Sequence, residues 1–120
     1  MDVTFFAERE GCFLNSFNAV PENSILGGGH FTKEQISDLL GCFKCSALVL
    51  NDNLWLLSAS FSERIAVMDD EQLKSVASEW SDEHSWHTVR VNAMDLAGHL
   101  LALKYAYLPH SNRRIFVLFE

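Results

Sequence analysis

Apolar residues recur at the spacing of an amphipathic helix in several segments of this 120-residue chain. The clearest case is Leu73, Val76, Ala77 and Trp80, which share one helical face and follow the acidic pair Asp69-Asp70. An aspartate before such a face can accept a hydrogen bond from a free N–H of the first turn, so one of the two caps this helix. The same spacing predicts helices over residues 12–20, 32–41, 69–80 and 94–107.

Shorter apolar or alternating runs, bounded by polar residues, indicate strands. Thr32 and Gln35 have the capping-box spacing, so a helix and not a strand begins at residue 32. Residues 21–30 contain Pro21 and three consecutive glycines and are expected to form a mobile loop, whereas residues 61–68 are ambiguous. Strands are predicted over residues 45–50, 54–59, 85–91 and 114–119, and residues 3–6 form either a short strand or an extended arm.

The length and the order of these elements predict one compact domain over residues 1–120. Hydrophobic residues make up 48% of the chain, enough to form a core. Helices come first and are then interspersed with strands, which is typical of an α+β fold with helices packed on a small, mostly antiparallel sheet. The hairpin signal at Asn51-Asp52-Asn53 supports antiparallel pairing of the two middle strands.

The net charge of −7 argues against binding to nucleic acids or to anionic membranes, both of which select basic surfaces. No apolar run is long enough for a transmembrane helix, and the first residues lack the pattern of a signal peptide. Three cysteines are an odd number, so a disulfide framework is not expected. These observations favour a reducing compartment, the cytoplasm or the nucleus.

Cys12 is the first candidate for a catalytic nucleophile. It follows Gly11 and opens the predicted helix over residues 12–20, in which Phe13, Phe17 and Val20 share one face. Free N–H groups and the helix dipole at this end favour the negatively charged thiolate, which is the nucleophilic form of cysteine. The predicted strand over residues 85–91 carries His87, which could serve as the base.

The sequence motifs around these residues resemble those of Josephin domains, a family of papain-like cysteine proteases that remove ubiquitin. The matching motifs are TFFAEREGC at residues 4–12, the Cys-x-x-Asn-x-x-Asn pattern from Cys12, FTKEQI at 31–36, EHSWHTVR at 83–90 and RIFVL at 114–118. They lie toward both ends of the chain. The resemblance implies a papain-like arrangement, a peptidase or isopeptidase activity, ubiquitin or a ubiquitin-like protein as partner, and no cofactor.

The resemblance also implies roles for single residues. Cys12 would be the nucleophile, and His87, or alternatively His84, would be the base, since Ser85 stands directly before Trp86 where the family has its histidine. The family's motif for the third catalytic residue is absent, and Asp95 and Asn92 are the nearby candidates to orient the imidazole. Arg9 stands nearest to the place of the family's oxyanion glutamine, and Asn18 would also contact the oxyanion or substrate.

Three other functions fit the same sequence. The departures at Arg9 and Ser85 fit a protein-binding module that has lost catalysis on the same fold. The small size fits a short viral-type protease that cleaves its own polyprotein. Two pairs of potential ligands, Cys42 with Cys45 and His84 with His87, could form a tetrahedral zinc site in an interaction domain.

Overall fold

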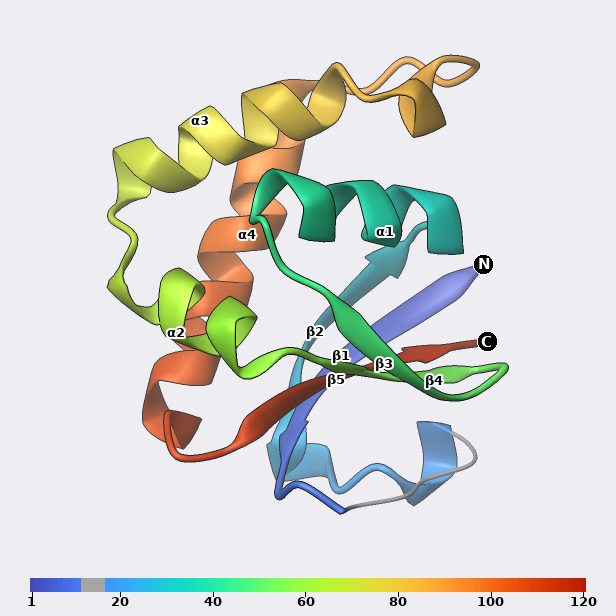
Figure 1. Ribbon diagram of the computed structural model, residues 1–120, viewed down its shortest axis with the longest axis vertical. Helices are drawn as coiled ribbons and strands as arrows, with labels where there is room; N and C mark the ends of the chain where they lie inside the picture. The colour runs from blue at the N-terminus through green and yellow to red at the C-terminus, as the bar shows by residue number, and fades with distance from the viewer. Residues whose placement is uncertain (12–16) are drawn as a thin grey trace.

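The structure is a computed structural model that describes residues 1–11 and 17–120. A five-stranded sheet runs through the molecule with four helices on one side of it (Figure 1). The strand order is β2-β1-β5-β4-β3, and every neighbouring pair is antiparallel. The strands are β1 (Asp2–Glu8), β2 (Ile25–His30), β3 (Ala47–Asn51), β4 (Leu54–Leu57) and β5 (Arg114–Phe119).

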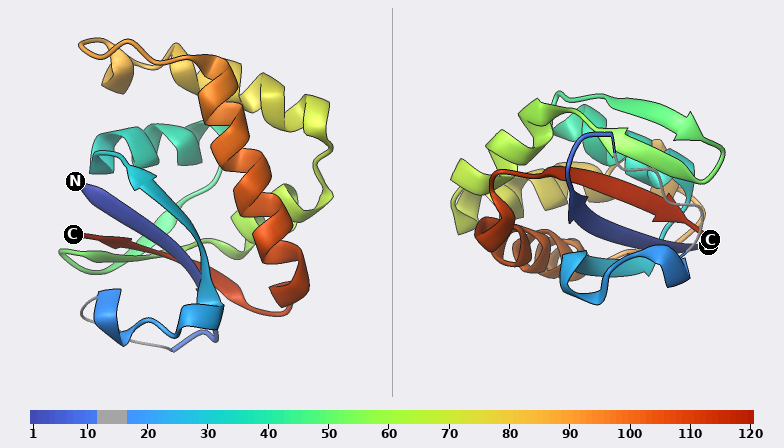
Figure 2. Two further views of the ribbon diagram at one scale, coloured as in Figure 1. Left: turned by 180° about the vertical axis from the view of Figure 1, so that it is seen from behind. Right: turned by 90° about the horizontal axis from the view of Figure 1, so that it is seen from below.

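Both faces of the sheet are buried at its centre. Alternate residues of β1 and β5, such as Phe5 and Val117, belong to the large core beneath the helices. The residues between them, such as Phe6 and Phe116, stack on the opposite face with ring centroids 5.1 Å apart. Val20 helps to cover this second face, on the side of the 3-10 turns η1 (Phe17–Ala19) and η2 (Glu22–Ser24) (Figure 2). Burial on both faces explains why β5 is a continuous apolar run and not an alternating one.

Two helices begin at the caps that the sequence predicts. The side chain of Thr32 accepts from the Gln35 N–H, and Asp69 does the same for Gln72, so both capping boxes form. Asn92 caps the last helix by accepting from the Met94 N–H. The helices are α1 (Lys33–Cys42), α2 (Ala59–Val67), α3 (Asp70–Ser81) and α4 (Ala93–Tyr107), which confirms three predictions and resolves the ambiguous residues 61–68 as helical.

The α+β class, the antiparallel hairpin and the closing strand are confirmed. The prediction of a mobile loop over residues 21–30 is wrong, because β2 runs through the three glycines and pairs with β1. A Cβ atom on Gly28 would lie 2.7 Å from the backbone oxygen of Val3, so this close approach depends on glycine. The order is also corrected: a strand, not a helix, comes first, and it lies inside the sheet.

The predicted strand over residues 85–91 is also wrong. Residues His84–Trp86 form the 3-10 turn η3, and no strand follows before α4. The backbone N–H of Ser85 donates to Asp38 and its carbonyl accepts from the Gln35 side chain, both at 3.3 Å, so α1 satisfies the groups that a strand would pair. Trp86 is buried against Trp80, which fixes the turn.

Among the residues that the structure describes, no helix is long and apolar enough to cross a membrane.

Candidate functional site

Cys12, the predicted nucleophile, lies outside the described residues, as does most of the predicted helix over 12–20. The described residues on either side of this segment include the two predicted oxyanion or substrate residues. Arg9 follows β1, Asn18 belongs to η1, and both are exposed. The η1 turn lies on the face of the sheet opposite the helices (Figures 1 and 2).

The two candidate bases lie together at another place. His84 is in η3 and His87 directly follows it; both are exposed, and their rings stack with centroids 5.4 Å apart. The η3 turn is on the helical side of the sheet, so the sheet separates both histidines from Asn18 in η1 (Figure 1). The structure therefore brings the two histidines together, but it does not bring them to the predicted oxyanion residues.

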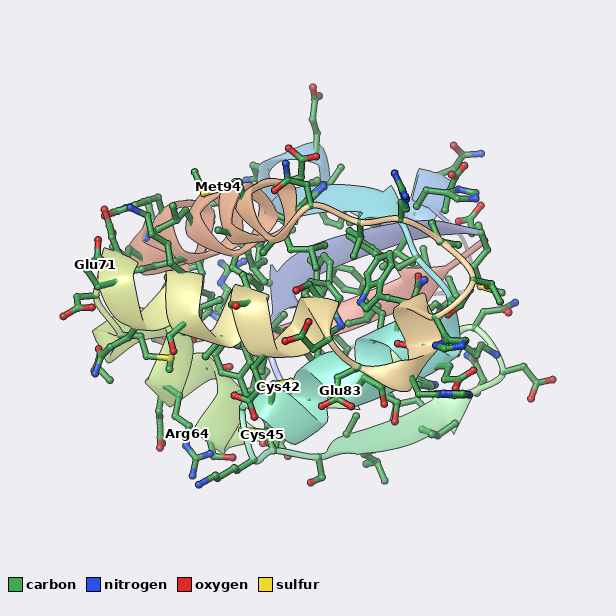
Figure 3. All side chains as sticks on the ribbon, turned by 90° about the horizontal axis from the view of Figure 1, so that it is seen from above. Cys42, Cys45, Arg64, Glu71, Glu83 and Met94 are labelled. Atoms are coloured by element: carbon green, nitrogen blue, oxygen red, sulfur yellow. The ribbon has the colours of Figure 1, made fainter. Side chains whose placement is uncertain are left out.

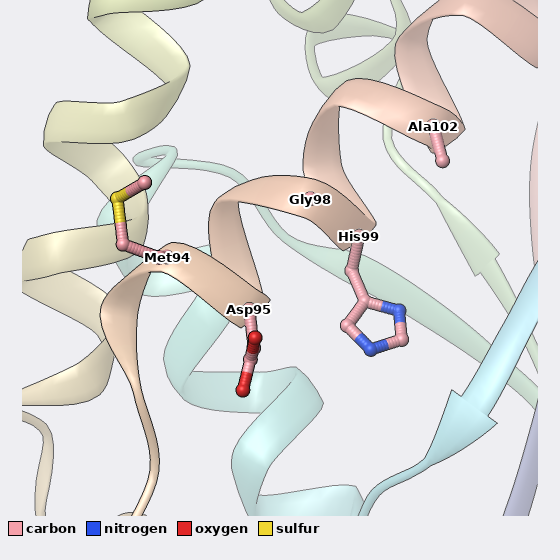
Figure 4. Close-up of a pocket in the computed structure, with 5 residues that line it drawn as sticks. All are labelled: Met94, Asp95, Gly98, His99 and Ala102. Atoms are coloured by element: carbon pink, nitrogen blue, oxygen red, sulfur yellow. The ribbon is translucent and has the colours of Figure 1, made fainter.

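Asp95, the predicted third catalytic residue, lies in the first turn of α4 and is exposed. It lines an open hollow of about 520 Å³ together with His99, one helical turn further on (Figure 4). The His99 ring contacts Phe31 edge-on with centroids 5.3 Å apart. Sequence analysis missed His99, although its i, i+4 spacing from Asp95 was a usable signal. Among the described residues no hydrogen bond joins Asp95 to His84 or His87.

The proposed zinc ligands are not gathered. No group of three or more potential ligands able to hold a metal ion occurs within the part of the chain that the structure describes, and that part contains all four. The Cys42 thiol donates to Glu83 at 3.7 Å, whereas the Cys45 thiol donates to the backbone oxygen of Phe43 at 3.2 Å. Each sulfur therefore has a local partner, and the structure does not gather Cys42, Cys45, His84 and His87 into one group of ligands.

Cys42, the last residue of α1, also lies in an acidic environment, with Glu83 beside it (Figure 3). Burial, followed by the negative charges of Glu79 and Glu83, raises the pKa of the Cys42 thiol to about 12. A negatively charged neighbour makes a thiolate less favourable, so the thiol stays protonated at neutral pH. The surroundings of Cys42 therefore disfavour the thiolate, which is the nucleophilic form of cysteine.

The β3 edge of the sheet presents the most unusual surface among the described residues. Leu48 and Val49 are consecutive, so their side chains point to opposite faces of the sheet, and yet they are 61% and 60% exposed. They pair with Leu56 and Trp55 of β4, and β3 is the last strand of the sheet on this side. We define the β3 edge as residues 47–51. Sequence analysis missed it, because the run Ala47–Leu50 has the composition of a buried strand.

The opposite edge of the sheet is protected. There β2 packs against α4, and three of its six residues are glycines, which present no side chains. Exposed apolar edge strands promote pairing with other chains, and proteins usually cover or charge them. The two edges of this sheet thus differ. One is covered by a helix, whereas the other ends in β3, which among the described residues pairs with β4 alone and carries exposed apolar side chains.

Comparison of the chain with protein-family models, with curated proteins and with solved structures gave no match.

Proposed function

We propose that this chain is a protein-binding module that takes an extended segment of a partner protein alongside β3. In this binding mode the added strand forms backbone hydrogen bonds with an exposed sheet edge, and alternate side chains give specificity. The observation that carries the proposal is the exposure of Leu48 and Val49 on both faces of one edge strand. A partner strand would cover both side chains at once, since its own side chains also alternate between the two faces.

The partner segment is expected to be basic as well as apolar. The chain has 16 acidic and 9 basic residues, so two copies would repel each other through their net charge of −7. Opposite charge speeds association and helps to select the partner. A second copy pairing through β3 is therefore less favoured than a segment in which apolar residues alternate with lysine or arginine.

Two synthetic peptides test the proposal. One alternates valine with lysine and the other valine with glutamate, and each is titrated into the ¹⁵N-labelled protein while backbone amide shifts are followed. We expect the lysine peptide alone to give saturable shifts, and the shifts to be largest over residues 47–51. Leu48→Lys should abolish them, because a charge is placed where the partner strand would pack.

The matched control is Val67→Lys, which places the same charge on α2 at a side chain that is 80% exposed and lies outside the β3 edge. This variant should bind the lysine peptide as the wild type does. Absence of shifts at β3 with the lysine peptide would refute the proposal. A concentration-dependent dimer in analytical ultracentrifugation, abolished by Leu48→Lys, would instead identify a second copy as the occupant.

We also propose, as a second candidate, a thiol peptidase or isopeptidase with a papain-like arrangement. The Josephin-like sequence motifs around Cys12 and Trp86 support it, and so does the exposed histidine pair beside Trp86. In this proposal Cys12 attacks the carbonyl carbon after His87 or His84 takes its proton, and Asp95 orients the imidazole. Because the sheet lies between both histidines and Asn18, the proposal requires a rearrangement that brings these groups to one side (Figure 1). Arg9 and Asn18 would contact the oxyanion, and the partner would be ubiquitin or a ubiquitin-like protein in the cytoplasm.

Covalent capture separates the two candidates. A ubiquitin derivative with a C-terminal electrophile should label a peptidase at Cys12, and Cys12→Ala should remove the labelling. Because the high pKa of Cys42 disfavours its thiolate, Cys42→Ala is a matched control that should still be labelled. If the wild type is not labelled, the deubiquitinase proposal is excluded, whereas the proposal that a partner strand binds at β3 still stands.

A further inference from the structure

His84 and His87 form an exposed pair of imidazoles at the turn η3. The backbone N–H of His87 donates to the carbonyl of His84 at 2.9 Å, which is the i→i+3 bond of a 3-10 turn. In such a turn the side chains at positions i and i+3 lie directly above one another. The backbone therefore accounts for the stacking of the two rings, whose planes differ by 20°.

The turn between the two histidines is anchored to the rest of the molecule. The backbone N–H of Ser85 donates to Asp38, and its carbonyl accepts from the Gln35 side chain. Trp86 is buried against Trp80. The backbone that carries both imidazoles is thus fixed before any ligand arrives, and a site formed in advance loses less freedom on binding.

The two rings have their nitrogen atoms available for a ligand. Within the described part of the chain, no hydrogen bond or ion pair involves either imidazole. A neutral imidazole offers a nitrogen lone pair, and histidine is the commonest metal ligand in proteins. Two such rings side by side therefore point to a metal ion as the ligand.

The charges around the pair also favour a cation. Asp82 and Glu83 directly precede the turn, and Asp38 contacts its backbone. Arg90 is the nearest basic residue in the sequence, and the whole chain has a net charge of −7. Such a field raises the local concentration of cations and lowers that of anions. A cation thus matches both the lone pairs and the surrounding charge.

The separation of the two rings suits a single ion. Two imidazoles on one metal ion, each at a metal–nitrogen distance of about 2.0–2.1 Å, have ring centroids roughly 4.5–5.2 Å apart for angles between square-planar and tetrahedral. The observed separation of 5.4 Å is only slightly longer. Because both side chains are exposed, rotation about their own bonds can turn one nitrogen of each ring toward the same ion.

We propose that His84 and His87 together bind one divalent first-row transition-metal ion, and that copper(II) binds most tightly. Imidazole suits zinc, nickel and copper, and among these ions copper(II) has the highest affinity for nitrogen ligands. No third histidine, cysteine or carboxylate of the described residues joins the pair in one group, so water occupies the remaining positions. The proposal does not depend on strand addition at β3, and it gives both histidines a role other than that of a catalytic base.

The test is a titration of copper(II) into the ¹⁵N-labelled full chain, because this paramagnetic ion broadens the amide signals of residues close to it. We expect substoichiometric copper(II) to broaden the signals of residues 83–88 first. His84→Gln and His87→Gln should each lower the affinity at least tenfold, because the second imidazole of a chelate acts at a high effective concentration. His99→Gln removes an exposed histidine from α4 and is the matched control, which should bind copper(II) as the wild type does.

Two results would overturn the proposal. One is the absence of broadening over residues 83–88. The other is undiminished binding by either His84→Gln or His87→Gln, which would identify an adventitious ion only, held by a single imidazole. Signals near His30, which lies 3.2 Å from Asp2, report any separate binding there. The labelling of Cys12 is measured in the presence of EDTA, so its outcome and that of the metal titration are independent.

Discussion

Gly28→Ala tests the most constrained contact of the sheet and should destabilise the protein. A Cβ atom at this position would lie 2.7 Å from the backbone oxygen of Val3 on the neighbouring strand β1. The obstacle is backbone of an interior strand, which cannot rotate away as a side chain would. Overpacking of this kind costs about 1–3 kcal/mol. Alanine recovers about 0.5–1 kcal/mol by restricting the unfolded chain. The two contributions leave a net loss of about 0–2.5 kcal/mol, with a central value of about 1 kcal/mol.

Gly98→Ala is the matched control, because it makes the same chemical change in the middle of α4. A Cβ atom there meets no other atom within 4 Å, and alanine is the better helix former by about 0.8–1 kcal/mol. The two variants should thus shift stability in opposite directions.

Urea denaturation followed by circular dichroism measures both free energies of unfolding. For 120 residues, a change of 1 kcal/mol corresponds to roughly 4 °C in melting temperature. A Gly28→Ala variant as stable as the wild type would refute the reasoning, because β1 and β2 would then not approach this closely.

Three further predictions follow from single contacts. Cys42, with its pKa raised to about 12, should react with iodoacetamide at pH 8 more slowly than Cys45, and faster labelling of Cys42 would contradict this. Because the thiol in the unfolded chain has its ordinary pKa of 9.0, the free energy of unfolding should also fall as the pH rises above 9. Tyr107 is 2% exposed, and its hydroxyl donates to the backbone oxygen of Arg113 at 2.6 Å. Tyr107→Phe removes this bond, so urea denaturation should show a free energy of unfolding lower by about 1–3 kcal/mol. An unchanged free energy would mean that the bond is absent. Asp69→Ala removes the N-cap of α3 and should lower the free energy of unfolding by about 1 kcal/mol, whereas an unchanged value would argue against the cap.

The helices could be predicted because their signals are local. The capping boxes at Thr32 and Asp69 lie within four residues of the helices they start, and the apolar face of α3 follows directly. The hairpin of β3 and β4 is equally local, since its strands are joined by a short polar turn. Such features depend on neighbours in sequence, so a single chain is sufficient to recognise them.

The errors arose where distant segments decide the backbone. Three glycines in a row indicate a loop by themselves, but β1 offers them a pairing edge and α4 covers them, so they form a strand. The alternating run after Glu83 indicates a strand, but Asp38 and Gln35 of α1 bind the backbone of Ser85 and hold it as a turn. In both cases the partner lies more than 20 residues away in the sequence.

The candidate sites divide in the same way. Residue types and spacing in the sequence identified Cys12, the histidine pair and Asp95 as groups capable of chemistry, because their reactivity is a property of the side chain. The sequence also determined the α+β class through its caps, its periodicity and its turns. Only the tertiary structure decided which apolar residues stay exposed on β3, which serine hydroxyls of the described residues are buried without a partner, and on which side of the sheet each described candidate lies. Exposure and proximity depend on contacts between segments far apart in the chain, and no local pattern encodes them.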